Sequence, residues 1–315
     1  MTDIAIIGSG FIGRAWTIAH ARAGNRVRMW DQDPAAAAKG KAYIAEILPD
    51  LAAKDLLNGG TPDEVLGRIV PVATLEEAVD GVSHVQENTF EEIETKRAVF
   101  RKLDAVTPAD AVIASSTSAL LPSTFTEDLA GRARCIVAHP INPPYLIPAA
   151  EVVPAPWTSP ETVERTAATL RAIGNAPIVM KREISGFLMN RLQGALLEEA
   201  FRLVAEGYAS VEDVDIGLRD GLALRWSFIG PFETIDLNAP GGVRDYVERY
   251  QGIYSGLALN ERPRVDWAGP VLEEVEKARR ALVPAADLQK RQEWRDRRLV
   301  ALLAHKRAAA REIGN

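Results

Sequence analysis

The sequence predicts an α/β domain with an open, doubly wound sheet, followed by an all-α domain. Short apolar strands alternate with helical segments through the first half of the chain, a pattern that favours an open parallel sheet. A glycine-rich turn directly follows the first of these strands. After Gly186 the strand signals stop and helical segments take over. These observations predict two domains, residues 1–185 and residues 186–315.

The predicted strands are short runs of β-branched and other apolar residues. They lie at residues 4–7 (IAII), 26–31 (RVRMWD), 69–73 (IVPVA), 84–87 (HVQE), 111–115 (AVIAS), 135–139 (CIVAH) and 177–180 (PIVM). One more strand is expected to return through Glu151 after a proline-rich turn.

Helical segments fill the intervals between the strands. One is predicted from Phe11 to about Gly24, and residues 91–106 (EEIETKRAVFRKLDAV) have helical periodicity. Residues 61–64 (TPDE) and 159–162 (SPET) each place a Ser or Thr before a proline, which is a helix start signal.

The second domain is predicted to open with one long helix over residues 186–207 (GFLMNRLQGALLEEAFRLVAEG). Its apolar residues occupy more than one side, so a single sheet face would not cover them. We therefore expect this domain to form a homodimer interface as well as to close over a substrate.

Composition and charge exclude several classes of function. The chain has 315 residues, of which 47% are hydrophobic and 25% charged, and its formal net charge is −6. A mildly acidic chain without a basic run is a poor candidate for binding nucleic acid or a membrane surface. The N-terminus does not resemble a signal peptide, and the single cysteine fits a cytoplasmic protein. None of the four histidines has zinc-ligand spacing, so no metal site is expected.

The turn after the first strand has the spacing of a dinucleotide-binding loop, with Gly8, Gly10 and Gly13 in a GxGxxG pattern. The first glycine allows the tight turn, the second lets the backbone approach a pyrophosphate, and the third allows helix and strand to pack closely. Phe11 and Ile12 then open the helix, whose N-terminus favours phosphate charge. This arrangement predicts a Rossmann-type, cofactor-binding domain.

The preferred cofactor follows from the end of the second strand. Asp31 lies eighteen residues after Gly13, where a carboxylate binds the hydroxyls of the adenosine ribose. A carboxylate repels a 2′-phosphate, and the next two residues, Gln32 and Asp33, supply no positive charge. NAD is therefore predicted in preference to NADP.

A histidine ends a predicted strand in the segment AHPINPPYLIPAAE, residues 138–151. A dehydrogenase needs a base to take a hydroxyl proton, and histidine has a suitable pKa. A carboxylate that accepts the other ring N–H holds the imidazole and stabilises its charged form. A hairpin could bring His139 and Glu151 together in this way, although a histidine at a strand end is more often structural.

These residues resemble a known signature. HPINPPYLIPAAEVV is similar to the H-x-x-N-P…E pattern of the 3-hydroxyacyl-CoA dehydrogenase family, which shares the N-terminal glycine loop. The resemblance implies that His139 is the catalytic base and Glu151 its partner. It also implies that Asn142 helps to build the substrate site.

Three further segments extend the resemblance. ASSTSALLPS is similar to the family's SNTSS segment, which implies that Ser118 binds the substrate oxygen and that Ser116, on the cofactor side, replaces an asparagine. GFLMNR matches GF-x-x-NR, which implies that Asn190 positions the substrate. In QENTFEEIETK, Glu87 and Lys96 occupy places similar to contacts on the nicotinamide side of the cofactor.

The segments AHPINPPYLIP, LRWSFIGPFETIDLN and RQEWRD resemble the branch of the family that contains lambda-crystallin and L-gulonate 3-dehydrogenase. This branch acts on small hydroxy acids, which implies oxidation of the C3 hydroxyl of an L-3-hydroxy acid. Arg225 could bind the substrate carboxylate, since a guanidinium matches it bidentately, or could form an ordinary salt bridge.

Three alternatives stay open. A 3-hydroxybutyryl-CoA dehydrogenase would need a basic site for the CoA phosphates, and the sequence offers only scattered lysines. An L-carnitine dehydrogenase would need groups around a trimethylammonium, for which Trp226 and Tyr145 are candidates. A structural protein that binds NAD without turnover would have no need for His139, Glu151, Ser118 and Asn190 together.

Overall fold

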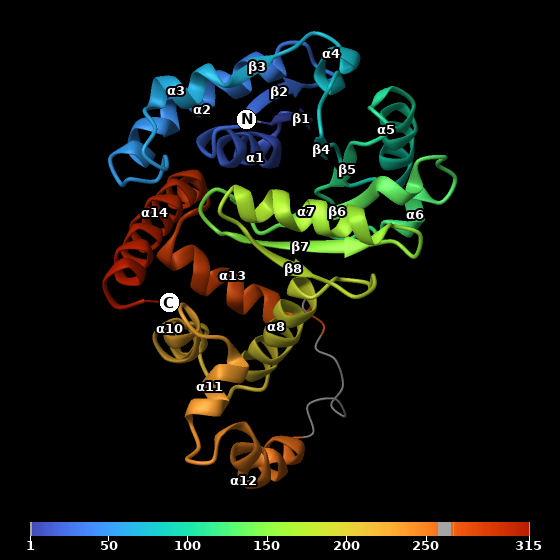
Figure 1. Cartoon of the computed structure of the whole chain (residues 1–315). Helices are drawn as coiled ribbons and strands as arrows, with labels where there is room; N and C mark the ends of the chain where they lie inside the picture. The colour runs from blue at the N-terminus through green and yellow to red at the C-terminus, as the bar shows by residue number, and fades with distance from the viewer. Residues whose placement is uncertain (1, 258–265, 267, 315) are drawn as a thin grey trace. The chain divides into compact units, whose positions relative to one another are not determined.

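The computed structural model describes residues 2–257, 266 and 268–314 (Figure 1). The chain divides into two compact units. The first comprises residues 1–190 and 296–315, and the second residues 191–295.

The first unit is built on one eight-stranded sheet with the strand order β3-β2-β1-β4-β5-β6-β7-β8. The strands are β1 (Asp3–Ile7), β2 (Arg26–Trp30), β3 (Ile69–Pro71), β4 (His84–Glu87), β5 (Val112–Ser115), β6 (Cys135–Pro140), β7 (Ala149–Pro154) and β8 (Ala176–Val179). The first six strands of this sheet, β3-β2-β1-β4-β5-β6, have the order of a Rossmann fold, which confirms the predicted fold class. The order reverses between β1 and β4, and ligands bind at such a switch point.

The sheet differs from a purely parallel one at one side. Strands β1 to β6 run parallel, whereas β7 pairs antiparallel with β6, and β8 runs parallel to β7. The physical reason is the short connection over residues 141–148, since a parallel crossover needs a dozen residues or more. The sheet is therefore mixed.

Helices cover both faces of this sheet, as the doubly wound prediction requires. In β1, Ile4 and Ile6 belong to one buried cluster and Ala5 and Ile7 to the other, because side chains alternate along a strand. Helices α1, α2 and α7 contribute to the first cluster and α4, α5 and α6 to the second. Their bounds are α1 (Phe11–Arg22), α2 (Ala36–Ala52), α4 (Leu75–Val79), α5 (Ile93–Val106), α6 (Ser123–Thr126) and α7 (Pro160–Ala172).

Both predicted helix start signals are confirmed. The Thr61 side chain accepts a hydrogen bond from the Glu64 backbone N–H at the start of α3 (Pro62–Gly67), and Glu64 completes the capping box. The Ser159 hydroxyl accepts from the Thr162 backbone N–H at the start of α7. Each cap satisfies a backbone donor that the first turn leaves free.

The second unit contains helices and, among its described residues, no strand. They are the greater part of α8 (Met189–Ala205), α9 (Val211–Ile216), a π-helical turn (Gly217–Leu222), α10 (Ala223–Trp226), α11 (Pro231–Leu237), α12 (Gly242–Gly256), α13 (Pro270–Leu282), a 3-10 turn (Ala285–Asp287) and the beginning of α14 (Leu288–Ile313). The all-α prediction is confirmed. In the described part of the chain, no helix has the length and apolar character needed to span a bilayer.

Helix α8 begins at Met189, three residues later than its sequence pattern predicts. Its apolar side chains are only partly covered within the single chain: Leu192 is 62% exposed. The homodimer contact predicted from this helix stays a prediction.

Candidate active site

The glycine loop lies at the switch point of the sheet, after β1. Gly8 has a φ of 89°, which favours glycine, and a Cβ on Gly13 would lie 1.9 Å from the Gly8 carbonyl oxygen. A Cβ on Gly10, by contrast, would meet no atom within 4 Å. The first and third glycines are thus required by the fold, while the second leaves open space at the helix N-terminus, where a pyrophosphate fits.

A pocket of about 370 Å³ adjoins this loop. It is lined by Gly8, Gly10, Trp30, Asp31, Gln32, Leu75, Asn88, Thr89, Phe90, Thr95, Val99 and Lys102. The Asp31 carboxylate is held by the Ser9 backbone N–H at 2.6 Å, by the Ser9 hydroxyl at 3.0 Å and by the Asp33 backbone N–H at 3.1 Å. An apolar pocket with a fixed carboxylate at its edge fits an adenosine group, so the residues present fit NAD.

The first turn of α1 follows the glycine loop and supplies backbone donors beside it. Phe11 and Ile12 are its first residues, and the first N–H groups of a helix have no partner within it. Arg14 folds back toward them: its Nε lies 3.3 Å from the Gly10 carbonyl oxygen, and its guanidinium stacks over the Tyr43 ring at 4.1 Å. The sequence pattern did not predict these contacts of Arg14 and Ser9, because they depend on how the folded loop places its groups.

The predicted dyad forms where β6 and β7 pair. His139 lies opposite Glu151 in the antiparallel register, and its Nδ1 is 2.6 Å from Glu151 Oε2. The other carboxylate oxygen accepts the backbone N–H groups of Leu188 at 2.7 Å and Met189 at 2.9 Å. His139 is 6% exposed and Glu151 is fully buried.

The charge state of Glu151 follows from these contacts. Burial by itself raises the pKa of the Glu151 carboxyl, but the hydrogen bonds from His139, Met189 and Leu188 outweigh burial and lower it below its ordinary value. The carboxylate is therefore ionised at neutral pH and accepts a hydrogen bond from the imidazole.

An unusual backbone conformation presents the two N–H groups to Glu151. Gly186 and Phe187 both lie in the left-handed region, with φ values of 77° and 47°. A bulky residue rarely adopts such a conformation, and residues of this kind cluster at functional sites. The Phe187 ring is buried, with its centroid 5.6 Å from that of His139. The turn thus delays the start of α8 and packs an aromatic ring against the imidazole.

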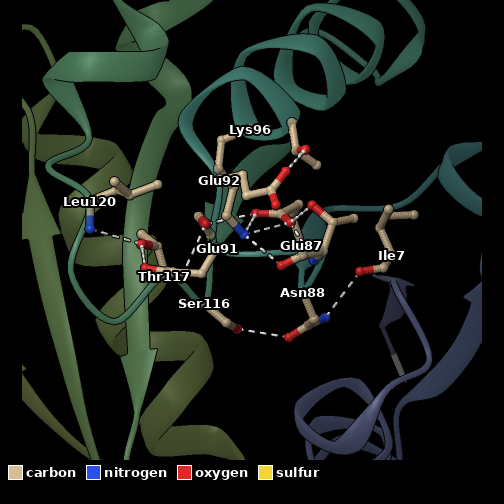
Figure 2. Close-up of polar contacts among 12 residues, drawn as sticks. Ile7, Glu87, Asn88, Glu91, Glu92, Lys96, Ser116, Thr117 and Leu120 are labelled. Carbon is tan, nitrogen blue, oxygen red and sulfur yellow. Dashed lines mark hydrogen bonds and ion pairs between the residues drawn. The ribbon is translucent and has the colours of Figure 1, made fainter.

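Ser118 and Asn190 meet in the first unit, although they are distant in sequence. The Asn190 side-chain amide donates to the Ser118 carbonyl oxygen at 2.7 Å. The Ser118 loop is also held by Glu91, whose Oε1 accepts the N–H groups of Ser118 and Ala119, each at 3.0 Å, and the Thr117 hydroxyl (Figure 2). Glu91 lies in the same QENTFEEIETK segment, but its spacing does not predict this role, because two of its three partners are backbone N–H groups of a distant loop.

Glu87 and Lys96 form a buried ion pair beneath the loop after β4 (Figure 2). The Lys96 Nζ lies 2.8 and 2.9 Å from the two Glu87 oxygens and 3.0 Å from the Thr89 carbonyl oxygen. The Ser115 hydroxyl donates to Glu87 at 2.7 Å. Glu87 is fully buried and Lys96 is 1% exposed. The pair braces the pocket wall, and the cofactor contact predicted for it stays a prediction.

The remaining predicted site residues lie in different surroundings. The Ser116 hydroxyl contacts Trp16, Gln86 and Asn88. Asn142 precedes a cis peptide bond to Pro143, and its buried Oδ1 has no hydrogen-bond partner. In the second unit, Arg225 lies on α10 with a buried Nε that has no partner either. Within the described ranges, no three His, Cys, Asp or Glu side chains group as metal ligands.

Comparisons with known proteins agree with this geometry. Residues 3–184 match the sequence model of the 3-hydroxyacyl-CoA dehydrogenase NAD binding domain, and residues 186–266 match that of the C-terminal domain. Lambda-crystallin of Oryctolagus cuniculus is 41% identical over 97% of this chain and 96% of its own length. L-carnitine dehydrogenase of Streptomyces griseus is 38% identical over 84% of this chain and 78% of its own length.

Solved structures of dehydrogenases are also similar to this chain. That of 5-formyl-3-hydroxy-2-methylpyridine 4-carboxylic acid 5-dehydrogenase, an NAD+-dependent dismutase, has a TM-score of 0.80 and 27% identity, with 98% of each chain covered. A 3-hydroxyacyl-CoA dehydrogenase from Archaeoglobus fulgidus has a TM-score of 0.69 and 27% identity, with 88% of each chain covered. The first domain of this chain therefore binds NAD, as the glycine loop predicts, and the whole chain belongs to the 3-hydroxyacyl-CoA dehydrogenase family.

Proposed function

We propose that this chain oxidises the C3 hydroxyl of a small L-3-hydroxy acid, similar to L-gulonate, to the 3-keto acid. The observation that carries the proposal is the contact between His139 Nδ1 and Glu151 Oε2. When the neutral imidazole donates its Nδ1–H to the carboxylate, Nε2 is left unprotonated and can take the hydroxyl proton. The ionised Glu151 then stabilises the imidazolium that forms.

Other residues of the first unit hold the substrate in this proposal. Ser118 presents an exposed hydroxyl on a loop that Glu91 and Asn190 hold. Ser118, Asn190 and His139 would position the C3 hydroxyl, and the unpartnered Oδ1 of Asn142 supplies one more acceptor. NAD, when bound at the glycine loop, accepts the hydride from C3. The segments that resemble the branch of lambda-crystallin and L-gulonate 3-dehydrogenase favour a free hydroxy acid.

Arg225 is proposed as the group that binds the substrate carboxylate. A guanidinium binds a carboxylate bidentately, and the buried Arg225 Nε has no hydrogen-bond partner within the described part of the chain. Arg225→Ala should raise KM for the acid far more than KM for NAD. Equal activity on an acid and its amide in the unaltered protein would contradict this role.

We further propose that two copies associate through the second unit in the cytoplasm. Large apolar side chains of this unit are exposed in the single chain, including Leu224, Phe228, Phe232 and Leu237. Contiguous exposed apolar surface is typical of protein–protein contacts. Light scattering on the purified protein should give twice the mass of 34.3 kDa, and a monomer would contradict the proposal.

The deciding experiment measures NADH formation with NAD and four substrates: L-gulonate, L-carnitine, 3-hydroxybutyrate and 3-hydroxybutyryl-CoA. We expect turnover of a free hydroxy acid, and His139→Ala should lower that rate by about 10²–10⁴. Turnover of the CoA ester alone, or of L-carnitine alone, would overturn the proposed substrate but not the dyad. A decrease of less than about tenfold in folded His139→Ala would refute the base, since a positioned base contributes more.

A further inference from the structure

The hydroxyl of Ser116 is the meeting point of a partly buried polar network, of which Figure 2 shows the contact with Asn88. It accepts the indole N–H of Trp16 at 3.0 Å and the side-chain amide of Gln86 at 2.7 Å, and it donates to Asn88 Oδ1 at 2.7 Å. A serine hydroxyl has one donor and two acceptor sites. These three contacts therefore use its full hydrogen-bonding capacity and leave none for a ligand.

One arm of the network leads to the NAD pocket. Asn88 lines that pocket, and its side-chain amide donates to the Ile7 carbonyl oxygen at 3.3 Å and to the Gln86 carbonyl oxygen at 2.8 Å. The Asn88 carbonyl oxygen lies 2.8 Å from the position a Cβ on Gly8 would take. Asn88 is thus packed directly against the first glycine of the cofactor loop.

The other arm leads to the catalytic strand. The Gln86 side chain donates to the Ala138 carbonyl oxygen at 3.3 Å, one residue before His139. Gln86 and Trp16 are 1% and 0% exposed, so these two side chains are shielded from water. Hydrogen bonds inside the protein are stronger than in water, and an unpartnered group there is costly. The network therefore joins α1, the loop after β4 and β6.

We propose that Ser116 is a positioning residue that fixes Asn88, and with it one wall of the NAD pocket, relative to the strand that carries His139. It does so without touching the cofactor. The inference depends on NAD binding alone, so it holds whichever hydroxy acid or ester the enzyme oxidises.

The test measures two quantities in the same variants, the Kd for NADH and the ¹H–¹⁵N resonance of the Trp16 indole. Ser116→Ala leaves the Trp16 N–H and Asn88 Oδ1 without their shared partner, so the Kd for NADH should rise about tenfold. The ¹H–¹⁵N resonance of the Trp16 indole, assigned with Trp16→Phe, should shift in the same variant. Ser116→Thr keeps the hydroxyl and should return the Kd to within about threefold of the unaltered protein.

A matched control separates positioning from a general loss of stability. Ser159→Ala removes a helix cap on α7 and should lower the free energy of unfolding while leaving the Kd for NADH unchanged. Two results for Ser116→Ala would overturn the proposal. One is a Kd within about twofold of the unaltered value, since a lost partner should cost more. The other is a raised Kd with an unshifted Trp16 resonance, which would make Ser116 a direct ligand.

A second variant serves if Ser116→Ala does not fold. Trp16→Phe removes the indole donor together with part of a fully buried ring, and the Kd for NADH should then rise by at least about threefold. An unchanged Kd in folded Trp16→Phe protein would contradict the proposal as well. Because neither measurement uses a hydroxy acid, both results are independent of the substrate proposed above.

Discussion

The imidazole Nδ1 of His139 lies 2.6 Å from Oε2 of Glu151, because antiparallel pairing of β6 and β7 places the two residues opposite each other. Glu151→Gln keeps the shape of the side chain but removes the charge that stabilises the imidazolium. We expect kcat to fall by about 10²-fold or more, with KM for NAD unchanged. Glu164→Gln, on the exposed side of α7, is the control. A kcat for Glu151→Gln close to that of the control would contradict the dyad.

Two glycines of the same loop should respond to alanine in opposite ways. In Gly13→Ala the new Cβ overlaps the Gly8 carbonyl oxygen, so the free energy of unfolding should fall by about 2 kcal/mol or more. In Gly10→Ala the Cβ meets no protein atom, so stability should be unchanged. The Kd for NADH should nevertheless rise at least about tenfold, since the backbone can no longer approach the pyrophosphate. Denaturant unfolding measures the free energy of unfolding, and NADH titration measures the Kd. Equal losses of stability in Gly13→Ala and Gly10→Ala would refute the prediction.

Asp31 should determine the preference for NAD. Its carboxylate is held by both polar groups of Ser9, so it cannot turn away from a 2′-phosphate without losing them. Asp31→Ser should weaken NADH binding by about tenfold and reduce discrimination against NADPH. Asp33→Asn is the control, because it removes one negative charge two residues away and leaves Asp31 in place. An unchanged ratio of NADH to NADPH affinity in Asp31→Ser would show that another group discriminates.

Two buried histidines should make the protein unstable in acid. Burial lowers the pKa of His20 to about 3, with a contribution from nearby His84, and burial lowers the pKa of His84 to about 4 despite its hydrogen bond to Gln86. Below pH 6.5 these two histidines therefore bind more protons in the unfolded chain than in the folded one. Each histidine should reduce the free energy of unfolding by about 1.4 kcal/mol per pH unit as the pH falls from there toward its folded pKa.

Denaturant unfolding between pH 7 and pH 5 measures that dependence. His20→Leu should make the curve of stability against pH shallower by about one proton, whatever it does to stability at pH 7. A slope for His20→Leu equal to that of the unaltered protein would mean that His20 is not the group that titrates.

The Glu87–Lys96 pair should tolerate no loss of a single partner. Lys96→Met leaves a buried carboxylate without its cation, and we expect the free energy of unfolding to fall by about 3–5 kcal/mol. Arg97→Met removes the adjacent cation, whose ion pair with Glu94 is exposed, and should change stability by less than about 1 kcal/mol. Thermal unfolding compares the two variants. A loss of stability in Lys96→Met as small as that in Arg97→Met would contradict this prediction.

The sequence by itself determined the class of fold, the cofactor and the family. Local sequence patterns were sufficient for the fold class, the cofactor and the family. Side chains alternate between the two faces of a strand, a capping residue directly precedes its helix, and the three glycines act within one turn. Gly8, Gly13 and Asp31 lie where their spacing predicted. The reversal of β7 also follows from chain length, although strand and helix alternation alone had favoured a parallel sheet.

Only the tertiary structure decided which groups meet across the sheet. Glu91 holds the Ser118 loop, Leu188 and Met189 bind Glu151 through the turn at Phe187, and Ser116 joins Trp16, Gln86 and Asn88. These contacts join residues that are distant in sequence, and several of them use backbone N–H groups, which every residue except proline carries. Side-chain identity therefore cannot predict such contacts, because they depend on where the strands place the chain.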